Sequence, residues 1–340
     1  MDTERRNGMK ETEKMEMGGY LSFELNDDGE YYKNYDPYTL KVNSGRTAIF
    51  VILQNVRPKR ILIPYFYCPS VEEFISELNI PIIKYDINKQ FMPEKLDIKE
   101  GDMLILVNYF GLYTDNINQV LQAYPDKNII VDNSQAFYAA PIMKKNIYNV
   151  YSCRKFFGVT DGAYVISQNP VHANLEKGRS SGYINFILRQ IEEGTNACYK
   201  ENLKNEERLA SQKELMSDLT KRILRSIDYA RAAERRRSNF IFLEKRLSFY
   251  QMLRLKLDQN VPYMYPLLCE YNIRKRLVEE HIYVPVLWKE LLDGQYQGTT
   301  EQYLSQNILY LPLDQRYSDK ELEYMARLIE KLIHEEGNKQ

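Results

Sequence analysis

The amino-acid sequence predicts an α/β fold in which a large, mainly parallel sheet has helices on both faces and a smaller C-terminal α+β domain follows. Three observations support this prediction. Short apolar runs alternate with amphipathic helical segments from residue 44 to residue 165. A long, charged helical region follows from 184 to 245, and strand-like and helical segments alternate again from 261 to 334. Such alternation is typical of a parallel sheet that is covered by helices.

The length and composition are those of a globular protein. The chain has 340 residues, which is enough for about two domains. Hydrophobic residues make up 44% and charged residues 27% of it, and the formal net charge is −1. A chain so close to neutral gives no electrostatic reason to expect binding to nucleic acid or to an acidic membrane. We predict a flexible tail over 1–17, a large cofactor-binding domain over 18–238 and a small α+β domain over 239–340.

Cysteine and histidine usage argues against disulfides and metal sites. No Cys-x-x-Cys pair occurs among the four cysteines, Cys68, Cys153, Cys198 and Cys269. The three histidines are far apart in sequence, which disfavours a histidine-rich metal site or a Ser-His-Asp triad. We expect no signal peptide, and no apolar run in the sequence approaches 18 residues. We therefore expect a cytoplasmic protein with reduced thiols, no membrane segment and no metal.

The expected elements of the first half follow from periodicity and turn residues. Alternating apolar residues predict a strand over 18–25. Polar caps followed by an apolar run predict a helix from residue 44 to about residue 53. The remaining segments alternate between strands and helices, with strands at 60–63, 80–85, 103–107, 128–131, 149–152 and 163–165 and helices at 70–78 and 114–123.

The second half is expected to be helical from 184 to 245 and mixed thereafter. Strands are predicted at 261–268, 282–287 and 308–313, and helices at 271–280 and 318–334. The last helix has a clear start, because Ser318 is followed three residues later by Glu321, the spacing of a capping box.

Two places in the first half could face a ligand. The helix that begins at residues 44–47 exposes free N–H groups and the positive end of the helix dipole, so it could bind phosphate; an ordinary N-cap is the alternative. Asp132 ends an apolar strand, and ligands of parallel sheets gather beyond the carboxyl ends of the strands. Its carboxylate could therefore face a pocket, or Asp132 could be an ordinary turn residue.

Lys155 follows Ser152 in a Ser-x-x-Lys arrangement and precedes an aromatic pair, Phe156-Phe157. An amine with apolar and aromatic neighbours loses part of its hydration, which favours its neutral, nucleophilic form. Such a lysine suits a Schiff base with pyridoxal phosphate (PLP), and the Ser152 hydroxyl could hold the phosphate. Taken alone, the spacing is weak evidence and fits a surface lysine in a loop better.

These signals occur in the order that PLP chemistry requires. The cofactor phosphate needs N–H groups and hydroxyls, the ring needs a stacking surface, the pyridine nitrogen needs a carboxylate and the aldehyde needs an amine. The chain offers the helix start at 44–47, a Pro-bounded aromatic loop at 64–69, Asp132, and then Ser152 with Lys155. This order is similar to that of fold-type-I PLP enzymes.

From about residue 18 to residue 332 the sequence resembles the DegT/StrS-type aminotransferases, many of which aminate keto groups on nucleotide-linked sugars. The similarity lies in segments 44–48, 63–68, 131–136, 151–162, 281–288 and 311–317. It implies the fold-type-I architecture and PLP as the cofactor. By this resemblance the catalytic residues are Lys155 and Asp132. The cofactor-binding residues are Ser44, Gly45, Arg46, Thr47, Tyr67, Cys68, Asp132, Gln135, Ser152 and Lys155.

The resemblance also implies individual roles. Lys155 would form the Schiff base, and Ser152 would bind the cofactor phosphate. Asp132 would face the pyridine nitrogen, and Gln135 would lie near the cofactor hydroxyl.

The sequence departs from the family pattern in three places. Cys68 stands where many members carry the aromatic residue that stacks on the cofactor, so Tyr67 or Phe66 could supply that surface. Ala163 stands where a second glycine is usual. The Gly-x-Asn-x-Arg-Met segment that typically follows the lysine by some forty residues, and helps to form the substrate site, is not found.

The function implied by the resemblance is transfer of an amino group from an amino-acid donor to a keto sugar, expected to be nucleotide-linked, or to a related carbonyl. The expected partners are these small molecules and a second copy of the chain, in a homodimer with its cofactor site at the interface. A PLP-dependent lyase or dehydratase is one alternative, although dehydratases resembling this family carry histidine in place of the lysine. A catalytically divergent PLP-binding protein with a regulatory or assembly role is another. The donor, the acceptor and the pathway stay open.

Overall fold

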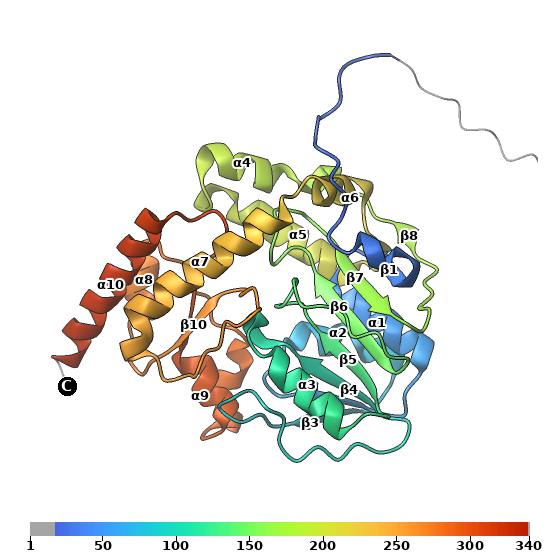
Figure 1. Ribbon diagram of the computed structural model, residues 1–340, viewed down its shortest axis with the longest axis horizontal. Coiled ribbons are helices and arrows are strands. Elements are labelled where there is room, and N and C mark those ends of the chain that lie inside the picture. The colour runs from blue at the N-terminus through green and yellow to red at the C-terminus, as the bar shows by residue number, and fades with distance from the viewer. Residues whose placement is uncertain (1–17, 339–340) are drawn as a thin grey trace, which may run out of the picture.

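The computed structural model describes residues 18–338 (Figure 1). The tail expected over residues 1–17 lies outside the described residues. A nine-stranded sheet forms the centre of the molecule, and a two-stranded antiparallel sheet lies among the C-terminal elements. The predicted α/β class, with a large, mainly parallel sheet, is confirmed.

The large sheet has the strand order β3-β2-β4-β5-β6-β7-β1-β9-β8. Strands β2 to β6 run parallel to one another, whereas β7 is antiparallel to both β6 and β1. Every residue of Met103–Val107 is buried, as expected for a parallel strand that is covered on both faces. The strands are β1 (Thr39–Val42), β2 (Ile61–Pro64), β3 (Ile82–Tyr85), β4 (Met103–Val107), β5 (Asn128–Asp132), β6 (Ile147–Ser152), β7 (Ala163–Ser167), β8 (Glu176–Lys177), β9 (Glu214–Leu215), β10 (Tyr265–Leu268) and β11 (Ile308–Leu311).

Helices cover both faces of this sheet. The chain passes from β2 through α2 to β3 in one direction and from β4 through α3 to β5 in the other, so right-handed crossovers place α2 and α3 on opposite faces. Helix α1 packs on α2 and against β6 and β7. Along residues 18–338 no helix is long and apolar enough to cross a membrane. The helices are α1 (Gly45–Val56), α2 (Pro69–Ile75), α3 (Thr114–Ala123), α4 (Asn185–Glu193), α5 (Tyr199–Ser211), α6 (Asp218–Arg225), α7 (Tyr229–Leu247), α8 (Arg274–Glu279), α9 (Thr300–Asn307) and α10 (Asp319–Gly337).

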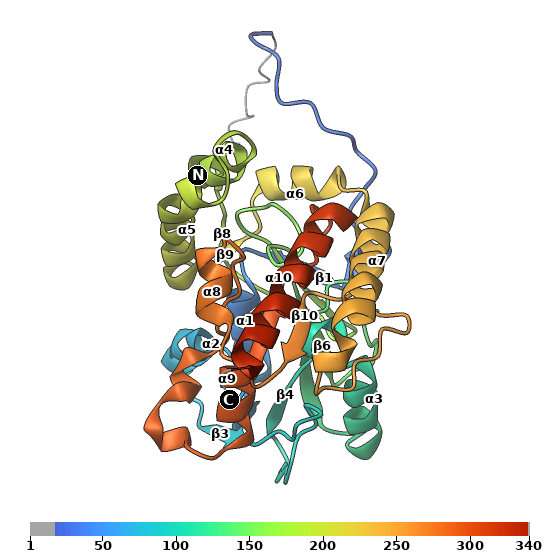
Figure 2. The same ribbon diagram turned by 90° about the vertical axis from the view of Figure 1, so that its left-hand side faces the viewer.

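The C-terminal elements gather beside the large sheet (Figures 1 and 2). Strands β10 and β11 pair with Tyr265 opposite Leu311, and both strands are buried. Helix α7 packs against α10, whose start has the predicted capping box of Ser318 and Glu321. The boundary expected after residue 238 falls inside the continuous helix α7, and the division into two domains stays a prediction.

Two predicted strands are wrong. Residues 18–25 form no strand, and the side chains of Tyr20, Leu21 and Phe23 are 99%, 90% and 70% exposed. Alternation alone does not make a strand, because the N–H and C=O groups also need a neighbouring strand. Residues 282–287 likewise form irregular chain, although alternate side chains in this segment are buried against the C-terminal core.

Candidate active site

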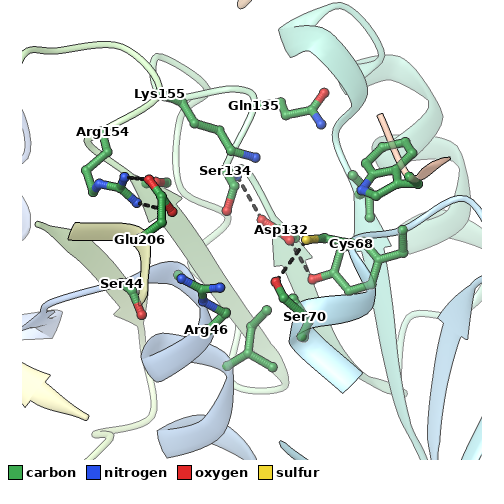
Figure 3. Close-up of a pocket in the computed structure, with 17 residues that line it drawn as sticks. Ser44, Arg46, Cys68, Ser70, Asp132, Ser134, Gln135, Arg154, Lys155 and Glu206 are labelled. Atoms are coloured by element: carbon green, nitrogen blue, oxygen red, sulfur yellow. Dashed lines mark hydrogen bonds and ion pairs between the residues drawn. The ribbon is translucent and has the colours of Figure 1, made fainter. Parts of the chain in front are cut away.

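A cavity of about 230 Å³ opens at the carboxyl ends of β2, β5 and β6, beside the first turn of α1 (Figure 3). This is the edge at which parallel sheets place their ligands. The structure brings nine of the ten expected residues into the cavity wall: Ser44, Gly45, Arg46, Tyr67, Cys68, Asp132, Gln135, Ser152 and Lys155. Figure 3 shows Arg46, Cys68, Asp132 and Lys155 pointing into the same space from different elements.

Thr47 is the expected residue that does not line the cavity. Its side chain is fully buried, and its hydroxyl donates to Asn43 Oδ1 at 2.6 Å and lies 3.0 Å from Ser44 Oγ. Ser44 Oγ in turn accepts from the Thr47 N–H at 3.1 Å, which makes Ser44 the N-cap of α1. Thr47 therefore holds the helix start in place from behind instead of facing a ligand.

Gly45, which follows the N-cap Ser44, allows the backbone to lie close to the cavity wall. A Cβ atom at Gly45 would lie only 3.2 Å from Ser134 Oγ, a tight contact that glycine avoids. The first turn of α1 carries no acidic residue, so its free N–H groups and dipole are not neutralised locally. Gly45 thus leaves an open cradle at the positive end of this helix.

Asp132 ends β5 with its carboxylate held at both oxygens. Oδ2 accepts from the Tyr67 hydroxyl at 2.6 Å, and Oδ1 accepts from the Ser134 N–H at 2.8 Å. Both Asp132 and Tyr67 are almost fully buried, at 5% exposure each. Burial, together with the negative charge of Asp132, raises the pKa of Tyr67 well above its usual range, so the phenol stays protonated as the donor.

Lys155 stands in the turn between β6 and β7, with its side chain exposed to the open cavity. The surrounding protein nevertheless restricts its hydration, and this desolvation lowers the pKa of Lys155. The carboxylate of Asp132 opposes the shift, whereas the charges of Arg154 and Arg46 reinforce it. The Lys155 amine also lies 5.8 Å from the centre of the Tyr263 ring. The site therefore favours a neutral amine more than bulk water does.

Two arginines flank the cradle. Burial lowers the pKa of Arg46, whose guanidinium has no carboxylate within ion-pair distance among residues 18–338. Arg154 pairs with Glu206 of α5, and its Nε is buried without a hydrogen-bond partner. Burial lowers the pKa of Arg154 to about 10, and the charge of Arg46 acts in the same direction. Positive charge is thus concentrated beside the start of α1.

Gln135 is fixed by the chain that follows β4. Its Oε1 accepts from the N–H of Phe110 at 2.9 Å, and its own side chain is almost fully buried. The turn is tight here: Gly111 has φ +69°, and a Cβ atom on it would lie 2.9 Å from the Gln135 carbonyl oxygen. Only glycine combines this left-handed conformation with so close an approach.

The cavity also contains residues that the sequence analysis did not single out. Trp288 lines the wall and packs edge-to-face on Phe66, with ring centroids 4.4 Å apart. Its φ of 57° is left-handed, and such strain often marks functional sites. Ser70 also lines the cavity, and its Oγ lies 3.0 Å from Sγ of Cys68. Arg154 was the residue most accessible to sequence reasoning, since it directly precedes Lys155.

A second, larger cavity of about 790 Å³ adjoins the first, and the two share Arg154, Lys155 and Glu206. Its far wall comes from the C-terminal elements and includes four tyrosines, Tyr263, Tyr283, Tyr317 and Tyr324. Lys155 is therefore accessible from two sides, from the small cavity at the sheet edge and from the large one beneath the C-terminal elements.

The small cavity fits PLP in its chemistry. The cofactor needs an amine, a carboxylate, and N–H groups with positive charge for a phosphate. Lys155 and Asp132 supply the first two, and the α1 start with Gly45 and Arg46 supplies the third. The cradle at Gly45, which a Cβ atom would fill, is the observation on which this fit rests. Among the described residues no group of three or more His, Cys, Asp or Glu side chains could hold a metal ion.

Comparison with known proteins finds the same architecture in solved structures. No family model matches the chain. No curated protein matches it either. The sugar aminotransferase CalS13 from Micromonospora echinospora superposes with a TM-score of 0.61 at 14% identity, covering 88% of this chain and 89% of that one.

Two further solved structures extend the comparison. A DegT DnrJ EryC1 StrS aminotransferase from Brucella abortus gives a TM-score of 0.54 at 13% identity, with 86% and 85% of the two chains covered. NtdA from Bacillus subtilis, solved with bound cofactor PMP, gives 0.58 at 15% identity, with 87% of this chain and 73% of that one covered. At such identities the likeness shows a shared fold.

Proposed function

We propose that this protein is a PLP-dependent aminotransferase of the DegT/StrS type, with Lys155 and Asp132 as its catalytic residues. The observation that carries the proposal is the convergence of the Lys155 amine, the buried Asp132 carboxylate and the uncompensated start of α1 on one cavity. The fold shared with the sugar aminotransferase CalS13 and with NtdA, which was solved with bound PMP, supports it.

The residues of the small cavity divide the binding of PLP among them. The free N–H groups of the α1 start, the Ser152 hydroxyl and the Arg46 guanidinium would hold the phosphate. Asp132 would face the pyridine nitrogen and keep it protonated, while Tyr67 keeps the carboxylate oriented. When bound, PLP supplies an electron-withdrawing ring that acidifies the α-hydrogen of an attached amino acid.

Lys155 then carries the proton transfer. Its lowered pKa makes a neutral amine available at a lower pH than in an exposed lysine, and Nζ can accept the proton that leaves the α-carbon of the donor. Nζ of Lys155 can then give this proton to the cofactor carbon that is bonded to the transferred nitrogen. This transfer completes the donor half of the reaction. The acceptor half runs these proton movements in reverse, in a ping-pong sequence.

The large cavity is the place we propose for the substrates. Lys155 is part of its wall, and its tyrosines can contact a sugar ring. The amino group would pass from an amino acid to a keto sugar. This choice follows the descriptions of the structural neighbours as sugar aminotransferases.

We also propose that the working unit is a cytoplasmic homodimer and that the chain divides into two domains near residue 238. The dimer is supported by apolar side chains on the outer helices. Leu188 and Ile191 of α4 are 47% and 83% exposed, and Tyr199 at the start of α5 is 61% exposed. Apolar surface of this kind is commonly covered by a partner.

The donor half-reaction tests the proposed function directly. Purified protein loaded with PLP should convert glutamate, or another amino acid from a panel, to its keto acid while the cofactor becomes its pyridoxamine form. Absorbance spectra and keto-acid analysis follow the two products together. A Lys155→Ala variant is the control and should bind PLP without this conversion. Protein that contains PLP but converts no donor would contradict the proposal.

A further inference from the structure

Building on the proposed function, we propose that the acceptor is an uncharged keto sugar or keto cyclitol that carries no nucleoside diphosphate. The large cavity beside Lys155 carries the argument. A diphosphate is recognised by unpaired arginine or lysine side chains and by free helix N-termini. Within the described part of one chain, each such group of this cavity other than Lys155 is engaged by a carboxylate or by other oxygens of the protein, although Arg154 Nε keeps no hydrogen-bond partner.

Arg316 is the first of these groups, and Asp314 neutralises it. The guanidinium makes two hydrogen bonds to this carboxylate, from Nε to Oδ1 at 2.7 Å and from Nη2 to Oδ2 at 2.8 Å. The same oxygen Oδ1 accepts from the Arg316 N–H at 3.1 Å, so one short turn closes on itself. Burial alone would raise the pKa of Asp314, but Arg316 lowers it overall, and the pair is fully charged at neutral pH.

Arg154 and Arg236 are likewise engaged. Arg154 pairs with Glu206, which also lines the cavity. Arg236 is 2% exposed and donates to Gln315 Oε1 at 2.8 Å. It also donates to the carbonyl oxygens of Tyr263, Pro262 and Phe156, at 3.0, 3.2 and 3.4 Å. Its donors are directed at one side-chain oxygen and three backbone carbonyl oxygens, which leaves none for a phosphate.

The start of α10 reaches the cavity and is blocked in the same way. Glu321 accepts from the Ser318 N–H at 2.7 Å in the capping box, and Asp319 adds a second carboxylate to the first turn. The hydrogen bonds from Ser318 lower the pKa of Glu321, so this carboxylate stays negative. An incoming phosphate would meet the Glu321 carboxylate and the Asp319–Arg235 ion pair at the only end of the helix that could attract it.

The small cavity shows the opposite arrangement. There, α1 begins without an acidic residue in its first turn, and no carboxylate in the described chain pairs with Arg46. The start of α1 lines the small cavity and the first turn of α10 lines the large one, yet of these two helix starts only that of α1 carries no acidic residue. Residues 18–338 of one chain therefore offer unpaired phosphate-binding groups on the cofactor side and engage the corresponding groups on the substrate side.

What remains in the large cavity suits a polyhydroxylated ring. Aromatic rings with hydroxyl tips contact the C–H faces of a sugar and its hydroxyl groups at once. Tyr283 and Tyr324 present such rings at 42% and 56% exposure. Glu280 adds a carboxylate with no cation within ion-pair distance in the described residues, and carboxylates accept hydrogen bonds from sugar hydroxyls. The volume of about 790 Å³ is large enough for a single sugar or cyclitol ring, and it leaves space through which the donor or the product can pass.

Nucleoside diphosphate binding is the first test, and it does not depend on turnover. UDP, dTDP and CDP are titrated calorimetrically into protein that carries PLP. We expect affinities weaker than about 1 mM. Binding of any of the three in the micromolar range would overturn the inference, whatever the enzyme does with its substrates.

A double variant and a control test whether the carboxylates of Asp314 and Glu321 prevent nucleoside diphosphate binding. Asp314→Asn combined with Glu321→Gln should free Arg316 and the α10 start, and UDP should then bind at least tenfold more tightly than to the unaltered protein. The control is Glu290→Gln, because Glu290 is exposed and lines neither cavity. No gain in the double variant, or an equal gain in the control, would show that these carboxylates do not exclude the diphosphate.

The acceptor itself is tested in the second half-reaction. The pyridoxamine form is first generated with a donor, which establishes the proposed function separately. It is then mixed with a free keto hexose, a keto inositol or a UDP-linked 4-keto sugar. We expect a free acceptor to restore the PLP form at least tenfold more efficiently than the UDP-linked sugar. A preference for the linked sugar, or no reaction with any free acceptor, would overturn the inference while leaving the donor chemistry intact.

Discussion

Tyr67 donates a hydrogen bond of 2.6 Å to the buried carboxylate of Asp132, and this bond links the ends of two strands, β2 and β5, that β4 separates in the sheet. The tyrosine comes from the loop after β2 and the aspartate from the end of β5. Since Asp132 also accepts from the Ser134 N–H, the orientation of its carboxylate is fixed before any ligand binds. A preoriented charge needs no reorganisation during a reaction, which is the condition under which electrostatic stabilisation is most effective.

We expect Asp132→Asn to slow the donor half-reaction by about 100-fold or more while the protein still folds. An amide cannot balance a protonated pyridine nitrogen, so the ring would withdraw electrons less effectively. Stopped-flow absorbance with saturating donor measures the rate. The matched control is Tyr67→Phe, which keeps the carboxylate and removes one hydrogen bond, and should cost about tenfold. Equal rates for Asp132→Asn and the unaltered protein would place the acid elsewhere.

Lys155 should be the lysine that carries the cofactor. Borohydride reduction of PLP-loaded protein, followed by proteolysis and mass spectrometry, is expected to give one pyridoxyl-modified peptide that contains Lys155. Lys213, which instead lies over the rings of Phe50 and Phe74, serves as an internal comparison. An adduct on any other lysine would contradict the assignment.

The pH dependence of Lys155 has a defined sign. Burial lowers its pKa below the usual 10.5, and the charge of Asp132 partly opposes this shift. The neutral, reactive amine therefore predominates from a lower pH than in an exposed lysine. In cofactor-free protein, labelling of Lys155 by trinitrobenzenesulfonate, resolved by peptide, should have its midpoint below pH 10.5. Asp132→Asn should move the midpoint to lower pH, and Arg46→Gln should move it upward; reversed directions would refute this account.

Arg236→Lys should lower the free energy of unfolding by about 2 kcal/mol or more. The guanidinium serves four acceptors from a buried position, and an ammonium cannot reach all of them. Chemical denaturation monitored by circular dichroism measures the change. Arg231→Lys, an exposed position on the same helix, is the control and should change stability by less than about 0.5 kcal/mol. Equal losses in both variants would show that the buried network is not responsible.

The purified protein should be a dimer of 40.3 kDa chains. Light scattering coupled to size exclusion at low micromolar concentration measures the mass. Ile191→Glu should shift the mass toward the monomer, because it places a charge on the exposed apolar face of α4. Ile241→Glu is the control, since Ile241 is 57% exposed on α7. A fully active, PLP-loaded monomer would exclude a shared site.

The parts of the fold that sequence analysis predicted well are those with strong local signals. Apolar runs such as 103–107 and 128–131 are strands because burial on both faces excludes polar residues. Ligands gather at the carboxyl ends of parallel strands, and this rule predicts that Asp132 and Ser152 lie at the same edge of the sheet as Lys155. The structure places all three in one cavity wall. The capping box of α10 was visible for the same reason, because both of its residues lie within one turn.

The features that sequence analysis missed depend on distant partners. The alternating segment at 18–25 lacked a neighbouring strand, whereas the unremarkable residues 39–42 form β1 because β7 lies beside them. Thr47 has a hydroxyl that could bind a phosphate, but this hydroxyl donates a hydrogen bond to Asn43 and does not line the cavity. The partner of Arg154 is Glu206, some fifty residues away, and no local pattern joins the two.

The carbonyl of Phe156, next to Lys155, accepts hydrogen bonds from Arg236 at 3.4 Å and from Gln315 at 2.8 Å. The turn that carries Lys155 is therefore held by Arg236 and Gln315, which are synthesised about 80 and about 160 residues later. A nascent chain that ends before residue 315 already contains every strand of the large sheet, yet its lysine turn has only part of its support. The capture of cofactor during biosynthesis should accordingly wait for the C-terminal segment, however early the sheet itself can form.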